Sequence, residues 1–105
     1  DEVAWYSKNA QGQTHPVKDP SKKPNAWKLY GMSGNVWEWV WDSYAPYQLA
    51  EKSDPTGPLR GGSSRVFRGG SWSDVARGLR VADRDRSVPG YRAEDQGFRL
   101  SRSYP

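Results

Sequence analysis

Residues 34–42 read GNVWEWVWD, and this alternation constrains the fold more than any other feature of the chain. Successive side chains of a β-strand point to opposite faces of a sheet, so one face carries Trp37, Trp39 and Trp41. The other face carries Val36, Glu38 and Val40. Because both faces are largely apolar, we expect a central strand that is covered on both sides. A Glu38 carboxylate among such neighbours would need a cation or several hydrogen-bond donors.

Shorter patterns predict three further strands. Residues 65–68 (RVFR) predict a strand that ends at Gly69 and Gly70. Residues 79–84 alternate weakly and predict another, and residues 97–100 (GFRL) predict a closing strand with Phe98 and Leu100 on one face. No segment has a long 3.6-residue period, so we expect any helix to be short.

The remaining segments are expected to be loops and turns. Residues 3–6 (VAWY) form the only apolar cluster near the start and predict a short strand or an anchored loop. Residues 54–58 (DPTGP) predict a turn, and residues 85–96 predict a loop that is interrupted by Pro89 and Gly90.

The composition predicts a single small domain with an aromatic core. Only 34% of the 105 residues are hydrophobic, a value that is typical of chains with weak cores. However, the chain contains six Trp, six Tyr and two Phe, and each buried aromatic side chain removes about 150–250 Å² from water. Eleven Gly and eight Pro predict many turns. We therefore expect one domain over residues 1–105, held together by a few large side chains.

The two kinds of basic residue are segregated along the chain. Every lysine lies at or before Lys52, whereas the rest of the chain uses only arginine. Arginine offers a planar fork of donors, so the second half predicts structural bonds from guanidinium groups to carboxylates and carbonyls. The net charge is +4, but acidic residues that would repel phosphate lie among the arginines. We therefore expect no nucleic-acid partner.

Several residue types that would support catalysis or membrane insertion are missing from the sequence. The chain has no cysteine, which excludes disulfides, thiolate metal sites and thiol catalysis, and leaves the compartment undecided. No apolar run approaches the ~20 residues of a membrane span, so none is predicted. His15 is the single histidine, and no pattern of serine and carboxylate marks it as a catalytic base. We expect His15 to be a hydrogen-bonded loop residue.

Several phrases in a fixed order resemble the formylglycine-generating enzyme, or sulfatase-modifying factor, family. They are THPV at residues 14–17, PNAWKLYGMSGNVWEW at 24–39, DPTGP at 54–58, RVFRGGSW at 65–72 and GFRL at 97–100. Their order and spacing are similar to the C-terminal half of that family. The resemblance implies an α+β, C-type-lectin-like fold with short twisted antiparallel sheets, few short helices and much loop. It implies that residues 1–105 are a compact version of this domain or its C-terminal portion.

The resemblance also implies a chemistry that this chain lacks. The oxidases of the family bind copper through two cysteines after the RGGS phrase, and here residues 72–79 read WSDVARGL. Copper(I) prefers soft sulfur ligands, so we expect no copper and no oxidase activity. The alternative function is a non-copper-binding relative or subunit of a formylglycine-generating-type enzyme.

Calcium is the metal that the resemblance does support. Relatives bind it around the GNVWEW phrase, and the matching ligands here are the carbonyl groups of Gly34 and Val36 and the carboxylate of Glu38. Oxygen ligands of this kind suit Ca²⁺. Where relatives place an Asn or Asp, this chain has Gly31, which removes one ligand. The other interpretation is that Glu38 pairs with an arginine such as Arg68 or Arg99.

Residues 72–100 alternate between positions that match the family pattern and positions that do not. The second set comprises Ser73, Asp74, Val75, Gly78, Asp83, Asp85, Ser87, Val88, Gly90, Tyr91, Ala93 and Asp95. Many of these positions are Asn or Asp in relatives. All of the residues in this set are reachable when an AAC codon becomes NNC, as happens in the variable proteins of diversity-generating retroelements, which this pattern resembles. We interpret the set as a candidate ligand-binding surface.

The pattern therefore predicts a non-catalytic binding module that displays a variable surface on a rigid scaffold. Loops on a rigid frame commonly carry recognition, and tyrosine is a common anchor in variable binding surfaces, so we expect Tyr91 to be the main contact. The expected partner is a protein ligand. The variable-protein interpretation also predicts display on a cell surface or a virus particle.

Overall fold

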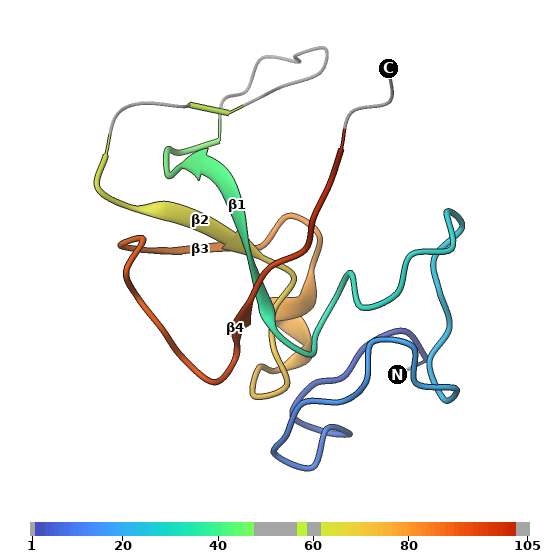
Figure 1. The fold of residues 1–105 in the computed structure, drawn as a ribbon. Helices are drawn as coiled ribbons and strands as arrows, with labels where there is room; N and C mark the ends of the chain where they lie inside the picture. The colour runs from blue at the N-terminus through green and yellow to red at the C-terminus, as the bar shows by residue number, and fades with distance from the viewer. Residues whose placement is uncertain (1, 48–56, 59–61, 103–105) are drawn as a thin grey trace.

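The computed structural model describes residues 2–47, 57–58 and 62–102 of the chain (Figure 1). Within this part, the elements in chain order are β1 (Trp37–Ser43), β2 (Arg65–Arg68), the 3-10 helix η1 (Ala76–Leu79), β3 (Arg84–Ser87) and β4 (Gln96–Gly97). Residues 54–56 of the expected DPTGP turn lie outside the described residues. No helix in the described part is long and apolar enough to cross a membrane.

The four strands form one small curled sheet in the order β3-β2-β1-β4 (Figure 1). Strand β2 pairs antiparallel with both β1 and β3, whereas β4 runs parallel to β1. Because β3 and β4 lie at opposite edges of the sheet, residues 88–95 must cross from one edge to the other. We call this segment the crossover loop.

Strand β1 confirms the alternation only over its first half. The rings of Trp37 and Trp39 both pack edge-on against Phe67, with ring centroids 5.2 Å and 5.1 Å away. The pairing of β1 with β2 then shifts between Trp39 and Ser43. Within this irregular stretch Trp41 is 76% exposed, so the expectation that both faces of the strand are covered is wrong there. The shift in register has turned this side chain away from the packed face.

The segment before β1 is an anchored loop rather than a strand. A single parallel bridge joins Trp5 to Gly34. The Trp5 ring stacks on His15 at a centroid distance of 3.7 Å, and the ammonium group of Lys22 lies 3.9 Å from the Trp5 ring centroid. The Nε2 of His15 lies 2.8 Å from the carbonyl oxygen of Ala10. The histidine is therefore a hydrogen-bonded loop residue, as predicted.

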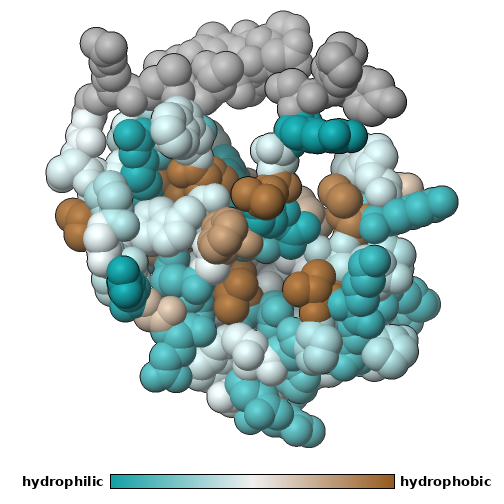
Figure 2. Space-filling model, in the orientation of Figure 1, coloured by the Kyte–Doolittle hydropathy of each residue, from teal (hydrophilic) through white to brown (hydrophobic). Residues whose placement is uncertain are grey.

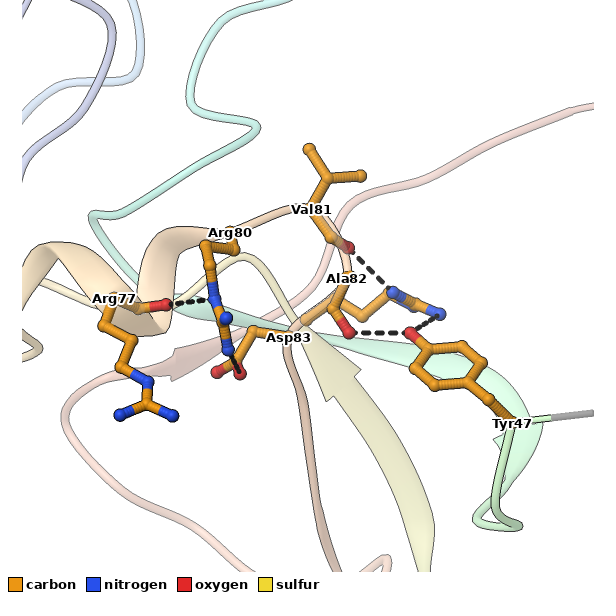
Figure 3. A network of polar contacts seen from close by, with 7 residues as sticks. Tyr47, Arg77, Arg80, Val81, Ala82 and Asp83 are labelled. Atoms are coloured by element: carbon orange, nitrogen blue, oxygen red, sulfur yellow. Dashed lines mark hydrogen bonds and ion pairs between the residues drawn. The ribbon is translucent and has the colours of Figure 1, made fainter.

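Arginine side chains tie the irregular segments together by donating to main-chain carbonyl groups. Arg84 donates to the carbonyl of Ala45 at 2.8 Å, and Arg65 donates to the carbonyl of Trp41 at 2.8 Å. Figure 3 shows the network beyond η1. The guanidinium group of Arg68 donates to the carbonyl of Val81, and the Tyr47 hydroxyl donates to the carbonyl of Ala82. These bonds confirm the structural role that was predicted for the arginine-only half.

Two of the expected strands are misplaced. Residues 79–84 contain the end of η1 and the first residue of β3, whereas the rest of β3 and the first residue of β4 fall in the expected loop 85–96. The sequence of β3 is RDRS, which has no apolar face, so its pairing with β2 supplies the strand structure. Strand β4 ends at Gly97, and Phe98 and Leu100 are 74% and 90% exposed instead of forming a covered face.

The expected fold class also needs a correction. The described residues contain no α-helix, only the single turn of η1, and the sheet is mixed rather than antiparallel. Apolar side chains that remain at the surface are scattered among hydrophilic ones on the face shown in Figure 2. The C-type-lectin-like description of the fold stays a prediction.

The bridge between Trp5 and Gly34 leads to a stability prediction. Gly34 is buried with a φ of 76°, and a Cβ there would overlap the carbonyl oxygen of Trp5. We expect Gly34→Ala to lower the free energy of unfolding by at least about 3 kcal/mol, because the steric overlap adds to the strain of the left-handed conformation. Urea denaturation measures the change.

The matched control for this change is Gly12→Ala. Gly12 has a similar φ of 71°, but a Cβ added to it would have no neighbour within 4 Å. It should cost only about 1–2 kcal/mol, the strain of the backbone conformation alone. Equal losses in the two variants would contradict the role assigned to the contact between residues 5 and 34.

Candidate functional site

The crossover loop and the sheet border a cavity of about 460 Å³ that is open to solvent. Its lining residues are Trp37, Phe67, Asp74, Asp85, Arg86, Ser87, Tyr91, Asp95 and Gln96. Five of these belong to the predicted ligand-binding set, namely Asp74, Asp85, Ser87, Tyr91 and Asp95. The structure therefore gathers part of that set around one concave surface.

Each wall of the cavity comes from a different element. Trp37 at the start of β1 and Phe67 in β2 form the floor, but both side chains are buried, so the accessible lining is mainly polar. Strand β3 contributes Asp85 and Ser87 at the sheet edge, and Asp85 lies opposite Phe67 in the ladder. The crossover loop contributes Tyr91, which is 45% exposed and stands at the rim. The cavity exists because the loop passes over the packed face of β1 and β2.

A buried serine fixes two of the carboxylates. Ser71 is fully buried, and its hydroxyl donates to Oδ2 of Asp74 at 2.7 Å and lies 3.3 Å from Oδ2 of Asp95. The backbone N–H of Ser71 also donates to Asp74, at 2.8 Å. Asp74 is thus part of the scaffold as well as the cavity wall. The expectation that every side chain of the set points only into solvent does not hold for this residue.

The charge of the cavity wall is negative. Three carboxylates line it, from Asp74, Asp85 and Asp95, against the single guanidinium of Arg86. That guanidinium lies 4.1 Å from the centroid of the Tyr44 ring. Within the described part of the chain, the ion pairs involve Glu2, Glu38 and Asp83, and none involves a cavity carboxylate.

The other predicted residues lie around the cavity or apart from it. Ser73 is exposed, and its hydroxyl lies 3.5 Å from Asp95. A Cβ built on Gly78 would lie 3.4 Å from Cβ of Asp74, so this position adjoins the same wall. Val75 is 66% exposed at the start of η1. Asp83 instead pairs with Arg80 at 3.2 Å, outside the cavity (Figure 3).

Three predicted positions belong to the crossover loop without lining the cavity. Val88 and Gly90 are exposed, and the carbonyl of Val88 accepts from the N–H of Tyr91 at 2.9 Å in a turn. Ala93 is partly buried and its carbonyl accepts from the N–H of Gln96 at 3.2 Å. These residues shape the loop that presents Tyr91.

Sequence reasoning missed four of the lining residues. Trp37, Phe67 and Arg86 were expected only to build the scaffold, and Gln96 was not singled out. The cavity depends on the path of the crossover loop over the sheet, which follows from the position of β4 beside β1. The signal in the sequence that could have indicated the cavity was the presence of the β1 tryptophans together with a polar loop later in the chain.

The expected calcium ligands form a different arrangement. The carboxylate of Glu38 receives two hydrogen bonds from Arg99, at 2.6 Å and 2.7 Å. The same guanidinium donates to the carbonyls of Tyr30 and Gly31, at 3.1 Å and 2.8 Å. The bond with Glu38 also raises the pKa of Arg99 above its ordinary value.

The pairing of Glu38 with Arg99 is therefore the arrangement that the structure contains. Gly34 is used in main-chain bonding, since its N–H donates to the carbonyl of Gly69 at 2.7 Å. In the described part of the chain, no three histidine or acidic side chains are placed to hold a metal ion. Calcium at Gly34, Val36 and Glu38 stays a prediction, and it would require Glu38 to leave Arg99.

The chain belongs to the family described as the sulfatase-modifying factor enzyme 1-like domain, whose model matches residues 2–104. Among curated relatives, the formylglycine-generating enzyme of Streptomyces coelicolor is 41% identical over 93 residues, which are 84% of this chain and 29% of the relative. The serine/threonine-protein kinase pkn1 of Chlamydia pneumoniae is 40% identical over 87 residues, 79% of this chain and 14% of the relative. The chain thus spans less than a third of the length of these relatives.

Solved structures show the same family likeness. Treponema denticola variable protein 1 superimposes with a TM-score of 0.83 at 43% identity, covering 92% of this chain and 34% of that one. PvdO from Pseudomonas aeruginosa gives a TM-score of 0.78 at 29% identity, covering 92% of this chain and 38% of that one. The resemblance inferred from the sequence phrases is confirmed.

The Arg99 contacts lead to a second prediction. We expect Arg99→Lys to lower the free energy of unfolding by about 1–3 kcal/mol, because lysine cannot replace the fork that bonds Glu38 and two carbonyls at once. Arg77→Lys is the control, since that exposed residue lies in η1 and its change should stay within about 0.5 kcal/mol. Chemical denaturation of both variants measures the difference, and equal effects would contradict the assignment.

A calcium titration of the same proteins tests the remaining metal prediction. If Ca²⁺ binds at Glu38, it should raise the melting temperature of the wild-type protein and not that of Glu38→Gln. A similar response in both proteins would place any calcium elsewhere.

Proposed function

We propose that this chain is a non-catalytic binding module whose ligand-binding surface surrounds the cavity under the crossover loop. The observation that supports this most strongly is the cavity itself, which five of the predicted positions line. Its accessible lining is mainly polar, and polar groups that converge on a concave surface can orient a ligand. Apart from the bonds of Ser71 to Asp74, the framework bonds described above lie outside the cavity, so an exposed side chain at the rim such as Tyr91 is available to a partner.

The scaffold and the proposed surface use different residues. The structural bonds come from arginines and from Ser71, whereas six positions of the predicted set are exposed, namely Ser73, Val75, Asp85, Val88, Gly90 and Tyr91. Exposed positions on a rigid frame tolerate substitution because they contribute little to folding. That division is what a protein with a diversified surface needs.

The likeness to a variable protein supports the same proposal. Treponema denticola variable protein 1 shares 43% of its residues with this chain over the superimposed region. We propose that this chain likewise carries variation at the predicted set, as in diversity-generating retroelements, with a protein ligand and display on a cell surface or virus particle. We also propose that the fold is C-type-lectin-like and that residues 1–105 form one domain.

The alternative is a relative or subunit of a formylglycine-generating-type enzyme. Enzymes of that name are among the relatives, and the chain spans only part of their length. However, the chain has no cysteine, and Asp74 and Leu79 stand in the segment after RGGS where the resemblance implies the copper-binding pair. The binding module is therefore the function that this site supports better.

The division between scaffold and surface leads to a third prediction. Single changes of Ser73, Val75, Val88 and Tyr91 to alanine should each alter the free energy of unfolding by no more than about 0.5 kcal/mol. Asp74→Ala should cost about 1–3 kcal/mol, because it leaves the buried N–H of Ser71 without its acceptor and removes the shortest bond of the Ser71 hydroxyl. Urea denaturation of the panel distinguishes the two classes.

Selection from displayed libraries tests binding directly. One library randomises the six exposed positions named above, and a matched library randomises six exposed positions of the first segment, Lys8, Gln11, Gln13, Thr14, Val17 and Lys18. Selected against the same folded target protein, the first library should yield specific binders at least about tenfold more often. Equal yields from the two libraries would overturn the proposed surface.

A further inference from the structure

We propose that an apolar surface beside β4 is a docking site for the portion of chain that relatives carry outside the region they share with this protein. We call it the Arg99 surface, because its side chains belong to two segments that this arginine joins. They are Trp27, Leu29, Met32, Phe98 and Leu100, and all five are exposed. None of them lines the cavity or belongs to the predicted ligand-binding set, so this inference goes beyond the proposed function and does not rest on it.

The first segment of the Arg99 surface is held by the guanidinium group itself. Arg99 donates to the carbonyls of Tyr30 and Gly31, at 3.1 Å and 2.8 Å. These two residues lie between Leu29 and Met32, whose side chains are both exposed. A single exposed apolar side chain is ordinary in a monomer, whereas a group of them around one structural bond is typical of a surface that is covered by other protein.

The second segment lies at an open edge of the sheet. Strand β4 is an edge strand, and residues 98–100 continue beyond it without forming a strand. Phe98 and Leu100 flank Arg99, whose side chain bonds Glu38, and alternation along extended chain points both of them to the other side. An edge strand with exposed apolar side chains is a template for pairing with another strand. A partner can therefore pair with this edge and cover the two side chains together.

Trp27 is presented on a turn that is already ordered. Oδ1 of Asn25 accepts hydrogen bonds from the N–H groups of Trp27 and Leu29, at 3.0 Å each, and the Trp27 side chain is 81% exposed. Because the turn is fixed in advance, covering it costs little conformational entropy. Tryptophan is also one of the residue types that dominate binding energies at protein interfaces. Trp27 is therefore the strongest single anchor that this surface offers.

The comparisons indicate which partner fits this surface. The superimposed region makes up 34% of Treponema denticola variable protein 1 and 38% of PvdO, so most of each relative lies outside it. The five apolar residues fall within the phrases at 24–39 and 97–100, which carry the family resemblance. A surface that is built from family phrases, and not from the variable set, points to a partner that belongs to the family fold. We therefore assign it to the remaining portion of such a protein and not to a diversified ligand.

The test compares this chain with a chimera in which it replaces the superimposed region of Treponema denticola variable protein 1. Carbene footprinting measures the solvent access of single side chains in both proteins. Labelling of Trp27 and Phe98 should fall at least about fivefold in the chimera, because the core of an interface is fully buried. Labelling of Val81, which is 89% exposed and lies outside the Arg99 surface, should stay unchanged.

A matched pair of variants measures the energetic effect of docking by urea denaturation. Leu100→Ser should raise the unfolding equilibrium constant of the chimera at least about 30-fold, as expected for a buried leucine. In the chain alone the same change should alter that constant no more than about threefold, because the side chain is exposed there. Val81→Ser is the control, since Val81 and Leu100 are 89% and 90% exposed, and it should stay within about threefold in both proteins.

Three results would overturn the inference. They are unchanged labelling of Trp27 and Phe98, equal effects of Leu100→Ser in the two proteins, and a chimera that does not fold. A dimer of the chain alone that Leu100→Ser dissociates would also overturn it, because the occupant would then be a second copy. The library selection varies other positions, so the two proposals fail separately. Loss of the docking surface leaves the proposed function standing, and equal library yields leave the docking surface standing.

Discussion

The structure depends on guanidinium groups that donate to main-chain carbonyls in segments without regular secondary structure. A four-stranded sheet whose strands have two, four, four and seven residues satisfies few of the backbone polar groups of this chain. Carbonyls of loops must then find donors elsewhere, since a buried carbonyl without one is costly. Arg84 and Arg99 supply those donors to loop carbonyls over long sequence separations, and Arg65 supplies one to Trp41 where the pairing of β1 with β2 shifts.

This arrangement separates stability from recognition. The arginines act through fixed planar bonds beneath the loops, so the outward side chains of the same loops do not have to hold the fold. Ser71 is where the two systems meet, because its buried hydroxyl reaches carboxylates that also line the cavity. A surface of this kind can change most of its residues while a small number, such as Asp74, stay tied to the scaffold.

The sequence predicted the parts of the fold that depend on local pattern. Strand β2 has the predicted bounds, the start of β1 alternates as expected, and the arginine bonds follow from the segregation of Lys and Arg. It failed at β3, whose RDRS sequence becomes a strand only through pairing with β2. It also failed at Trp41, where a shift in register interrupts the alternation. The cavity was beyond prediction, because its floor and its rim meet only through the sheet order.

The crossover loop has a consequence for how such chains can diverge. The loop joins Ser87 of one edge strand to Gln96 of the other, and its eight residues must span the width of the sheet. A deletion in the crossover loop would strain the pairing of β3 or β4, and an insertion would change the position of the loop over the cavity. We therefore expect this loop to diverge by exchange of side chains at constant length, whereas most surface loops also tolerate insertions and deletions.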